Sequence, residues 1–364
     1  MNNNIYVTKS FLPQISEYEK YIAQIWENGQ LTNQGPLLRD FEQKASQYLG
    51  VDNFHFVSNG TIALQIALKS LDITEGEIIT TPFSYVATTS SILWERCEPV
   101  FVDIEPDTYC IDVTKIEAAI TNRTKAIMPV HVFGFPCDIE EIERIANKYN
   151  LRVIYDAAHA FGVKYKGKSL LSYGDISTCS FHSTKVFHTI EGGCVVAKDK
   201  QVSDKLELTK RFGHDVDKHI MLGINAKASE FQAAMGLCNL GYIDMLIQKR
   251  KKIFELYNAQ LNGYFKTPLV NVNKGIEHNY AYYPLVFHDA LQSTELIAKL
   301  NENGVFPRRY FYPSLNKLPY VTNTKSCPVS EDISSRIVCL PLYDSLSEED
   351  VLRICKILKN KDRV

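Results

Sequence analysis

The sequence predicts an α/β protein built on a mainly parallel sheet, followed by a smaller α+β part. Through the first two thirds of the 364 residues, apolar runs of strand length alternate with segments of helical period, which is the pattern of βαβ units. From about residue 228 this alternation gives way to a long helical stretch and then to a short mixture of strand and helix. We therefore expect a large domain over residues 1–245 and a small C-terminal domain over residues 246–364.

The sheet prediction depends on seven apolar runs, each short enough to be a buried strand and bounded by polar or turn residues. Together they predict a seven-stranded sheet. The runs are FHFVS (54–58), EIITTP (77–82), PVFVDI (99–104), AIMPVHV (126–132), RVIYDAA (152–158), TCSFHS (178–183) and GGCVVAK (192–198).

Segments between and after these runs carry apolar residues at three- and four-residue spacing, which predicts helices. Residues 61–71 and 138–150 have the pattern of crossover helices, and residues 228–261 form a long helical stretch that would join the two domains. The C-terminal part contains a strand-like run at 281–287, helical patterns at 293–304 and 347–360, and a Pro-rich connector at 311–320.

Composition and charge favour a globular protein that acts on a small molecule. Apolar residues make up 45% and charged residues 23%, and the net charge of −2 provides no excess of positive charge for a nucleic-acid backbone. We find neither a signal sequence nor an apolar run long enough for a membrane span, so we expect a cytoplasmic protein without a membrane partner. The nine cysteines lie mostly in apolar runs and are expected to be reduced. Cys179 and His182 have a spacing that suits zinc, but no second pair matches them, and we expect no metal site.

The stretch GVKYKGKS (162–169) matches the phosphate-loop pattern G-x-x-x-x-G-K-S. A phosphate loop leaves a strand and runs straight into a helix. Here the following residues break at Gly174 and continue as a strand, while VKYK alternates apolar and basic residues as a solvent-facing strand does. We therefore predict a hairpin that turns near Lys166 and Gly167, with nucleotide hydrolysis through Lys168 as the alternative.

Two charged residues stand where an α/β protein places its chemistry. Asp156 ends a buried apolar strand, at the sheet edge where ligands bind, although it could equally cap a helix. Lys185 lies among Ser, Thr and aromatic residues between two strand-like runs, and the alternative is a solvent-exposed lysine. In an apolar pocket a lysine loses its proton more readily, and the neutral amine forms a Schiff base with an aldehyde cofactor. The pair Gly192 and Gly193 would allow a tight turn or a close approach of the backbone to a ligand.

Two further segments suit the phosphate and the ring of such a cofactor. Asn59, Gly60 and Thr61 follow a strand and open a helix, so free N–H groups and a hydroxyl would face an anion, or Asn59 would simply cap the helix. Phe83 and Tyr85 follow the next strand and could stack on an aromatic ring, or pack in the core.

These four segments, in this order and at these separations, resemble the DegT/DnrJ/EryC1/StrS family of pyridoxal-phosphate-dependent sugar aminotransferases, which have the fold-type I architecture of the aspartate aminotransferase superfamily. The resemblance covers nearly the whole chain. It includes LTNQGPLLRDFEQKASQYLGV (31–51), PFSYVATTSSILWERCEPVFVDIEPDTYCID (82–112), TKAIMPVHVFG (124–134), GINAKASEFQAAMGL (223–237) and CLPLYDSLSEEDV (339–351).

The resemblance implies a role for each residue of the candidate site. Lys185 would form the Schiff base with pyridoxal phosphate and carry the proton between the substrate and the cofactor. Asp156 would pair with the pyridine nitrogen, which keeps the ring an electron sink. His159 stands where many relatives have glutamine, beside the cofactor ring. Relatives that lack the lysine and carry histidine in its place perform dehydration, so Lys185 separates this chain from them.

The remaining positions concern the cofactor's phosphate and ring. Gly60, Thr61 and Ser180 match the family's phosphate-binding positions, and Tyr85 matches its ring-stacking aromatic residue. Asn225 matches an asparagine that relatives contribute to the phosphate from the neighbouring subunit. The resemblance therefore implies a homodimer with shared active sites.

The implied reaction moves an amino group from L-glutamate to a keto group on a nucleotide-linked deoxysugar. Residues 155–193 look closest to enzymes that aminate carbon 4 of dTDP-4-keto-6-deoxyglucose for amino-sugar and lipopolysaccharide synthesis. Amination at carbon 3, a UDP-linked N-acetyl-4-keto sugar and a non-catalytic pyridoxal-phosphate-binding regulator remain as alternatives. Whether Arg308 and Tyr310 line the sugar pocket or a surface connector stays open, as does which of three histidines touches substrate: His182, His188 or His214.

Overall fold

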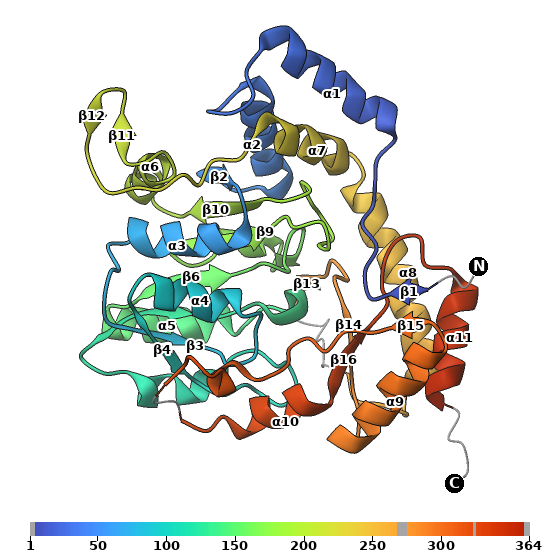
Figure 1. Cartoon of the computed structure of the whole chain (residues 1–364). Coiled ribbons are helices and arrows are strands. Elements are labelled where there is room, and N and C mark those ends of the chain that lie inside the picture. Colours follow the sequence, from blue (N-terminus) through green and yellow to red (C-terminus); the bar gives the residue numbers. More distant parts are fainter. Residues whose placement is uncertain (1–3, 268–274, 323–324, 360–364) are drawn as a thin grey trace.

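The structure is a computed structural model that describes residues 4–267, 275–322 and 325–359. A seven-stranded sheet with the order β2-β10-β9-β6-β5-β3-β4 forms its centre (Figure 1). Strand β10 runs antiparallel to both neighbours and every other pairing in this sheet is parallel. The predicted seven-stranded, mainly parallel sheet is thus confirmed. Its strands are β2 (Phe54–Val57), β3 (Glu77–Thr80), β4 (Glu98–Phe101), β5 (Thr124–Met128), β6 (Arg152–Asp156), β9 (Ile176–Ser180) and β10 (Gly193–Ala197).

Both faces of the sheet are covered because side chains alternate along each strand. Ile78 and Ile154 pack on one face, whereas their neighbours Ile79 and Val153 pack on the other. The first face is covered by α3 (Gly60–Ser70), α4 (Ala87–Trp94) and α6 (Lys200–Thr209). The second is covered by α2 (Pro36–Leu49), α5 (Ile139–Tyr149) and α7 (Glu230–Leu240). The crossover helices predicted at 61–71 and 138–150 are α3 and α5.

A second core lies in the C-terminal part and also takes in Ile5 near the chain start. The predicted strand at 281–287 and both predicted helices are present there, and β1 pairs with β15. The boundary at residues 245 and 246 stays a prediction, since α8 crosses it. The elements of this part are β1 (Ile5–Tyr6), α8 (Ile243–Leu261), β14 (Tyr283–Val286), α9 (Ala290–Glu302), β15 (Val305–Phe306), α10 (Pro328–Arg336), β16 (Ile337–Leu340) and α11 (Glu348–Lys359).

The long helical stretch expected at 228–261 is two helices, which corrects the prediction of one. Helix α7 ends at Leu240 and α8 begins at Ile243. The N–H of Gly241 donates to the carbonyl of Cys238 at 3.3 Å, three residues back, so the regular helical ladder stops there. Glycine is the poorest helix former after proline, which explains why the chain breaks at this residue.

Residues 162–169 form a hairpin and not a phosphate loop. Strands β7 (Lys164–Tyr165) and β8 (Lys168–Ser169) pair antiparallel, and the turn residues Lys166 and Gly167 have φ of 50° and 76°. Two consecutive positive φ angles are typical of the tight turn that suits a right-twisted hairpin. The hairpin prediction is confirmed, and the nucleotide-hydrolysis alternative is wrong, because only a three-residue 3-10 turn (Leu170–Ser172) and then strand β9 follow where a phosphate loop needs an α-helix.

Two segments lie outside these layers. Helix α1 (Ile15–Asn28) packs on α7, and the short hairpin of β11 (His214–Asp215) and β12 (Lys218–His219) stands clear of the body beside α6 (Figure 1). The hairpin region exposes the apolar side chains Phe212, Val216, Ile220, Leu222 and Ile224.

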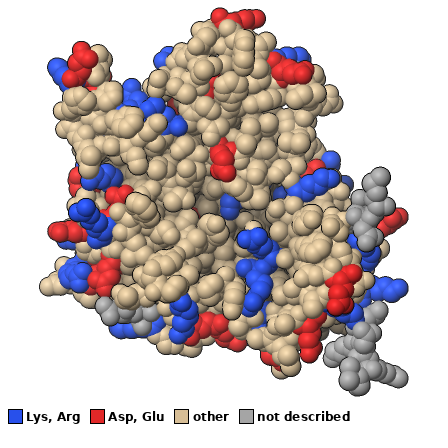
Figure 2. All heavy atoms as spheres, viewed as in Figure 1, with Lys and Arg blue, Asp and Glu red and all other residues tan. Residues whose placement is uncertain are grey.

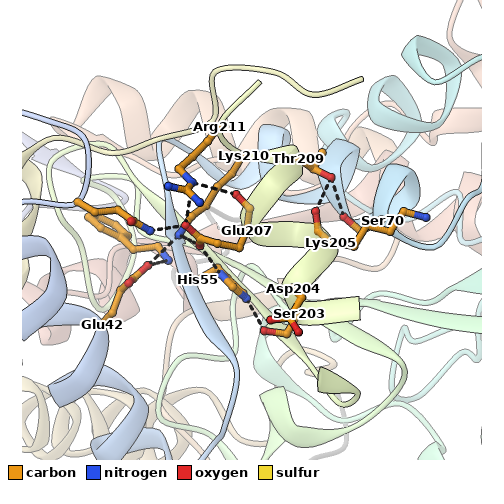
Figure 3. A network of polar contacts seen from close by, with 12 residues as sticks. Glu42, His55, Ser70, Ser203, Asp204, Lys205, Glu207, Thr209, Lys210 and Arg211 are labelled. Atoms are coloured by element: carbon orange, nitrogen blue, oxygen red, sulfur yellow. Dashed lines mark hydrogen bonds and ion pairs between the residues drawn. The ribbon is translucent and has the colours of Figure 1, made fainter. Parts of the chain in front are cut away.

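A polar network anchors the end of α6, from which the β11–β12 hairpin starts, to β2 and α2 (Figure 3). The ammonium group of Lys210 lies 2.7 Å from Glu207 and 3.3 Å from Glu42, and its side chain is only 2% exposed. Glu207 also contacts His55 of β2 at 3.3 Å and Arg211 at 3.0 Å. Burial would raise the pKa of Glu207, but the hydrogen bond with His55 and the charge of Lys210 outweigh it and lower that pKa to about 2. The carboxylate of Glu207 therefore stays charged beside the ammonium group of Lys210.

Candidate active site

A cavity of about 360 Å³ lies at the carboxyl edge of the central sheet, where β6 and β9 end and α3 begins. Residues next to β14 and after β15 close its other side. Figure 2 shows a hollow near the centre of the face viewed in Figure 1, with positively charged groups in it and beside it. The lining residues are Asn59, Gly60, Thr61, Leu64, Ser84, Tyr85, Ala87, Val130, Asp156, Ala158, His159, Thr178, Cys179, Ser180, His182, Thr184, Lys185, Glu191, Tyr282, Arg308, Tyr310 and Phe311.

The buried carboxylate at the bottom of the cavity is Asp156, the last residue of β6. Thr88 donates its hydroxyl hydrogen to one oxygen at 2.7 Å, and the N–H of Ala158 donates to the other at 3.1 Å. Burial raises the pKa of Asp156, while Thr88, the Ala158 N–H and the charge of Lys185 act in the opposite direction. Asp156 is therefore held in one orientation, and a cation on the cavity side would stabilise its charged form.

The amine of Lys185 reaches the same cavity and has no carboxylate partner among the described residues. It donates to the phenol oxygen of Tyr282 at 3.3 Å and lies 5.9 Å from the centre of that ring. Burial lowers the pKa of Lys185, although Tyr310 and Asp156 partly oppose this effect. A lysine with a lowered pKa is more often neutral, and the neutral amine is the nucleophile.

His159 forms one side of the cavity floor and is neutral. Its ring stacks on Phe311 with centroids 5.6 Å apart and meets Tyr282 edge-on at 4.9 Å. Its Nδ1 atom accepts a hydrogen bond from the N–H of Phe133 at 3.2 Å, which places the proton of the neutral ring on Nε2. Burial first, and then the charge of Lys185, lower the pKa of His159 well below its usual range.

The other end of the cavity is the N-terminus of α3. The side chain of Asn59 accepts from the N–H of Ile62 at 2.9 Å, so Asn59 is the helix cap, as the alternative for this segment proposed. The first N–H groups of the helix, at Gly60 and Thr61, have no partner within the helix and lie where they can bind an anion. A side chain at Gly60 would come within 2.9 Å of the Cβ atom of Ser180, so glycine lets these two segments converge.

The glycine pair after the lysine lets neighbouring segments pack closely. A Cβ atom on Gly193 would lie 2.8 Å from the backbone of Asn59, and one on Gly192 would overlap the hydroxyl of Thr189. Glycine here allows β10 to approach the chain beside β2.

The two aromatic residues after β3 have different environments. Phe83 is fully buried in the core, so its packing alternative holds. Tyr85 is 57% exposed and lines the cavity, and its ring stacks on no other ring among the described residues. Arg308 and Tyr310, for which a surface connector was the alternative, also line the cavity. Of the three histidines, His182 lines it.

Seven of the eight residues predicted for the site line this one cavity: Lys185, Asp156, His159, Gly60, Thr61, Tyr85 and Ser180. Asn225 does not, because it is exposed at the base of the β11–β12 hairpin, where it bridges to Arg211. His188 is tied to the carbonyl of Phe11 at 2.7 Å, and His214 lies in β11.

Sequence reasoning missed Tyr282 and Thr88, which contact the two charged groups of the site. Tyr282 belongs to a run interpreted only as a strand, 97 residues from Lys185. No spacing signal could have paired them, because the contact forms only when the C-terminal part folds against the sheet.

Over the residues described, no helix is long and apolar enough to span a membrane, and no group of three or more His, Cys, Asp or Glu side chains could hold a metal ion.

Known proteins resemble this chain over almost its full length. A dTDP-4-amino-4,6-dideoxy-D-glucose transaminase of Escherichia coli is 40% identical, with 99% of each chain covered. GDP-perosamine synthase of Escherichia coli O157:H7 is 35% identical, over 95% of this chain and 96% of that protein. The solved structure of DesI with its TDP-sugar product superposes with a TM-score of 0.93 at 28% identity, covering 98% of this chain and 93% of DesI. The family described as the DegT/DnrJ/EryC1/StrS aminotransferase family matches residues 14–359. The chain therefore belongs to this family of pyridoxal-phosphate-dependent aminotransferases.

Proposed function

We propose that this protein transfers the amino group of L-glutamate to dTDP-4-keto-6-deoxy-D-glucose and so makes dTDP-4-amino-4,6-dideoxy-D-glucose. The observation that carries the proposal is that one cavity is lined by the amine of Lys185, the carboxylate of Asp156 and the N-terminus of α3. Among the described residues, that amine forms no ion pair. The transaminase of Escherichia coli named above, with 40% identity over 99% of both chains, supports the choice of sugar.

The residues of the cavity fit pyridoxal phosphate. The N–H groups at Gly60 and Thr61 and the hydroxyl of Ser180 would hold its phosphate, because an oxyanion is favoured at a helix N-terminus. Asp156 would face the pyridine nitrogen, and the free ring face of Tyr85 would stack on the cofactor. Bound there, the cofactor supplies an aldehyde and an electron sink for breaking the C–H bond of the amino acid.

The remaining chemistry belongs to Lys185 and its neighbours. The amine of Lys185, with its pKa lowered by burial, would take the proton from the α-carbon of glutamate and pass it to the cofactor in the first half-reaction. In the second half-reaction it would take a proton back from the cofactor and give it to carbon 4 of the sugar. Tyr282, which accepts the hydrogen bond from this amine, would hold it in place between these steps. The neutral ring of His159, packed against Phe311, would fill the space beside the cofactor and keep water out.

We propose that the protein is a cytoplasmic homodimer with shared active sites. Asn225 lies outside the cavity of its own chain, at the base of a hairpin region that exposes five large apolar side chains. If a second copy of the chain covered these side chains, Asn225 of one subunit would lie beside the cofactor phosphate of the other. On this proposal Asn225→Ala weakens pyridoxal phosphate binding by roughly tenfold, the factor for one charged hydrogen bond. Unchanged affinity in a cofactor titration would exclude the shared site.

Related sugars are the alternatives, because relatives with other substrates are also similar. GDP-perosamine synthase of Escherichia coli O157:H7 is 35% identical, and a UDP-2-acetamido-2-deoxy-3-oxo-D-glucuronate aminotransferase of Pseudomonas aeruginosa is also 35% identical over 90% of this chain. Because both relatives are 35% identical to this chain, sequence identity does not separate amination at carbon 4 from amination at carbon 3.

The deciding experiment offers the purified protein, with pyridoxal phosphate and glutamate, three keto sugars in parallel: the dTDP-linked 4-keto sugar, its GDP-linked counterpart and a UDP-linked 3-keto sugar. We expect the highest kcat/KM with the dTDP-linked sugar. A higher value with either of the others would replace the proposed substrate, and no turnover of any of them would overturn the proposal.

A further inference from the structure

Arg308 lines the cavity, and its guanidinium group is free to bind a ligand. Its backbone is fixed, because its N–H donates to the carbonyl of Cys339 at 3.1 Å and its own carbonyl accepts from the Cys339 N–H at 2.7 Å. Its side chain forms no hydrogen bond or ion pair with another described residue, and its Cζ atom lies 5.7 Å from the centre of the Tyr310 ring. An arginine whose backbone is held in place and whose guanidinium has no protein partner can bind an anion with a small loss of conformational freedom.

The neighbouring Arg309 differs, because its guanidinium group contacts other residues of the protein. Its guanidinium stacks on Tyr312 at 3.5 Å and donates to the carbonyl of Ser335 at 2.9 Å. It does not line the cavity. The two adjacent arginines therefore differ: the side chain of Arg309 makes stabilising contacts within the protein, and Arg308 lines the proposed substrate cavity.

The acidic groups that line the cavity already have partners of their own. Asp156 accepts from Thr88 and from Ala158, and Glu191 lies 3.4 Å from the ring of His182. Neither neutralises Arg308. The positive charge at the wall of the cavity is thus available to a ligand.

Aromatic rings connect Arg308 to the reactive amine. The rings of Tyr310 and Tyr282 are 5.5 Å apart, and the amine of Lys185 lies 5.9 Å from the centre of the Tyr282 ring. The proposed phosphate site at Gly60 and Thr61 belongs to the sheet-bearing part of the chain, whereas Arg308 comes from the C-terminal part. An anion bound by Arg308 would therefore belong to the substrate and not to the cofactor.

We propose that Arg308 is the substrate's oxyanion-binding subsite: its planar guanidinium binds a carboxylate of the amino donor or the diphosphate of the sugar nucleotide. Both groups present paired oxygens that match the donor geometry of arginine. This inference rests on the proposed function only for the anionic nature of the two substrates.

Two non-reacting probes test the subsite without requiring turnover. Glutarate represents the dicarboxylate donor, and dTDP represents the nucleotide diphosphate. Each is titrated by calorimetry into the cofactor-loaded wild type, Arg308→Gln and the matched control Arg309→Gln. We expect Arg308→Gln to weaken binding of one or both probes by at least about tenfold, as for the loss of one charged hydrogen-bonding group, with Arg309→Gln unchanged. Thermal unfolding of each variant checks that it is folded.

The probe whose binding Arg308→Gln weakens identifies which substrate supplies the oxyanion. Loss of glutarate binding alone assigns the subsite to the donor carboxylate, loss of dTDP binding alone assigns it to the diphosphate, and loss of both makes it common to the two half-reactions. The inference is overturned if the wild type binds neither probe, if Arg308→Gln binds both normally, or if Arg309→Gln weakens them equally. Because the assay measures binding and uses no keto sugar, absence of amination together with normal probe binding would break the proposed function and leave this inference standing.

Discussion

Two lysines in the sheet-bearing part of the molecule, the partly buried Lys185 and the fully buried Lys210, lie in contrasting surroundings. Lys210 sits between two carboxylates, Glu207 and Glu42, at 2.7 and 3.3 Å (Figure 3). Lys185 has a tyrosine hydroxyl at 3.3 Å and, over the described part of the chain, no carboxylate within ion-pairing distance. The comparison teaches that burial alone does not decide what a lysine does. An ammonium group paired with a carboxylate favours its charged form and links two segments of the chain. A buried ammonium group without such a partner loses its proton more readily, and the neutral amine is a nucleophile.

The largest expected effect separates the two lysines by activity. Arginine keeps a positive charge but does not supply a neutral amine at any ordinary pH. We therefore expect Lys185→Arg to lower kcat on the order of 10³-fold or more, and Lys210→Arg to retain activity because its carboxylate partners still meet a cation. Steady-state assays of both variants with glutamate and the keto sugar measure the difference. Equal losses in the two variants would mean that Lys185 has only a structural role.

The carboxylate across the cavity from Lys185 gives the next effect. Asp156→Asn removes the charge that would keep the pyridine nitrogen protonated, and we expect kcat to fall on the order of 10²-fold. The matched control is Asp103→Asn. Asp103 is equally buried, but it accepts from the N–H groups of Val329 and Ser330 at the start of α10. That variant should lose stability and keep its kcat, and the reverse result for the pair would contradict the assignment.

Stability should separate the lysines in the opposite order. Lys210→Met leaves Glu207 and Glu42 facing each other without a cation, and we expect a loss of about 3 kcal/mol in the free energy of unfolding. Lys185→Met removes an amine that has no ion pair, so it should leave the stability of the cofactor-free protein unchanged or raise it. Urea unfolding of the cofactor-free proteins provides both values. A larger loss for Lys185→Met than for Lys210→Met would break the comparison.

The smallest expected effect is on the pH dependence of stability. Burial lowers the pKa of Lys185 in the folded protein below its value in the unfolded chain. Between these two pKa values the unfolded chain binds more protons, so the stability of the cofactor-free protein should rise as pH rises through this window. Lys185→Met should lack this rise. Parallel curves for the wild type and the variant would show that the amine of Lys185 has an ordinary pKa.

Much of the fold could be predicted because its signals are local. Each of the seven apolar runs became a strand, and the turn at Lys166 and Gly167 followed from residues next to one another. The single long helix was wrong for a local reason as well: Gly241 stands in its middle, and its weak helix propensity outweighed the apolar period around it. Residues such as Tyr282, which come from a distant segment, carried no signal that linked them to the site.

By itself, the sequence determined which segments become strands and helices, and which residue types stand at the ends of β6 and β9, because propensity, periodicity and turn chemistry act over a few neighbouring residues. Only the tertiary structure decided which charges are paired. Lys210 meets Glu42 from 168 residues away, whereas Lys185 forms an ion pair with no carboxylate in the ranges that the structure describes. Of two adjacent arginines, Arg308 lines the cavity while Arg309 stacks on Tyr312. The physical reason is that burial and pairing depend on groups brought together from distant parts of the chain, and these two quantities determine whether a charged side chain holds the fold or performs chemistry.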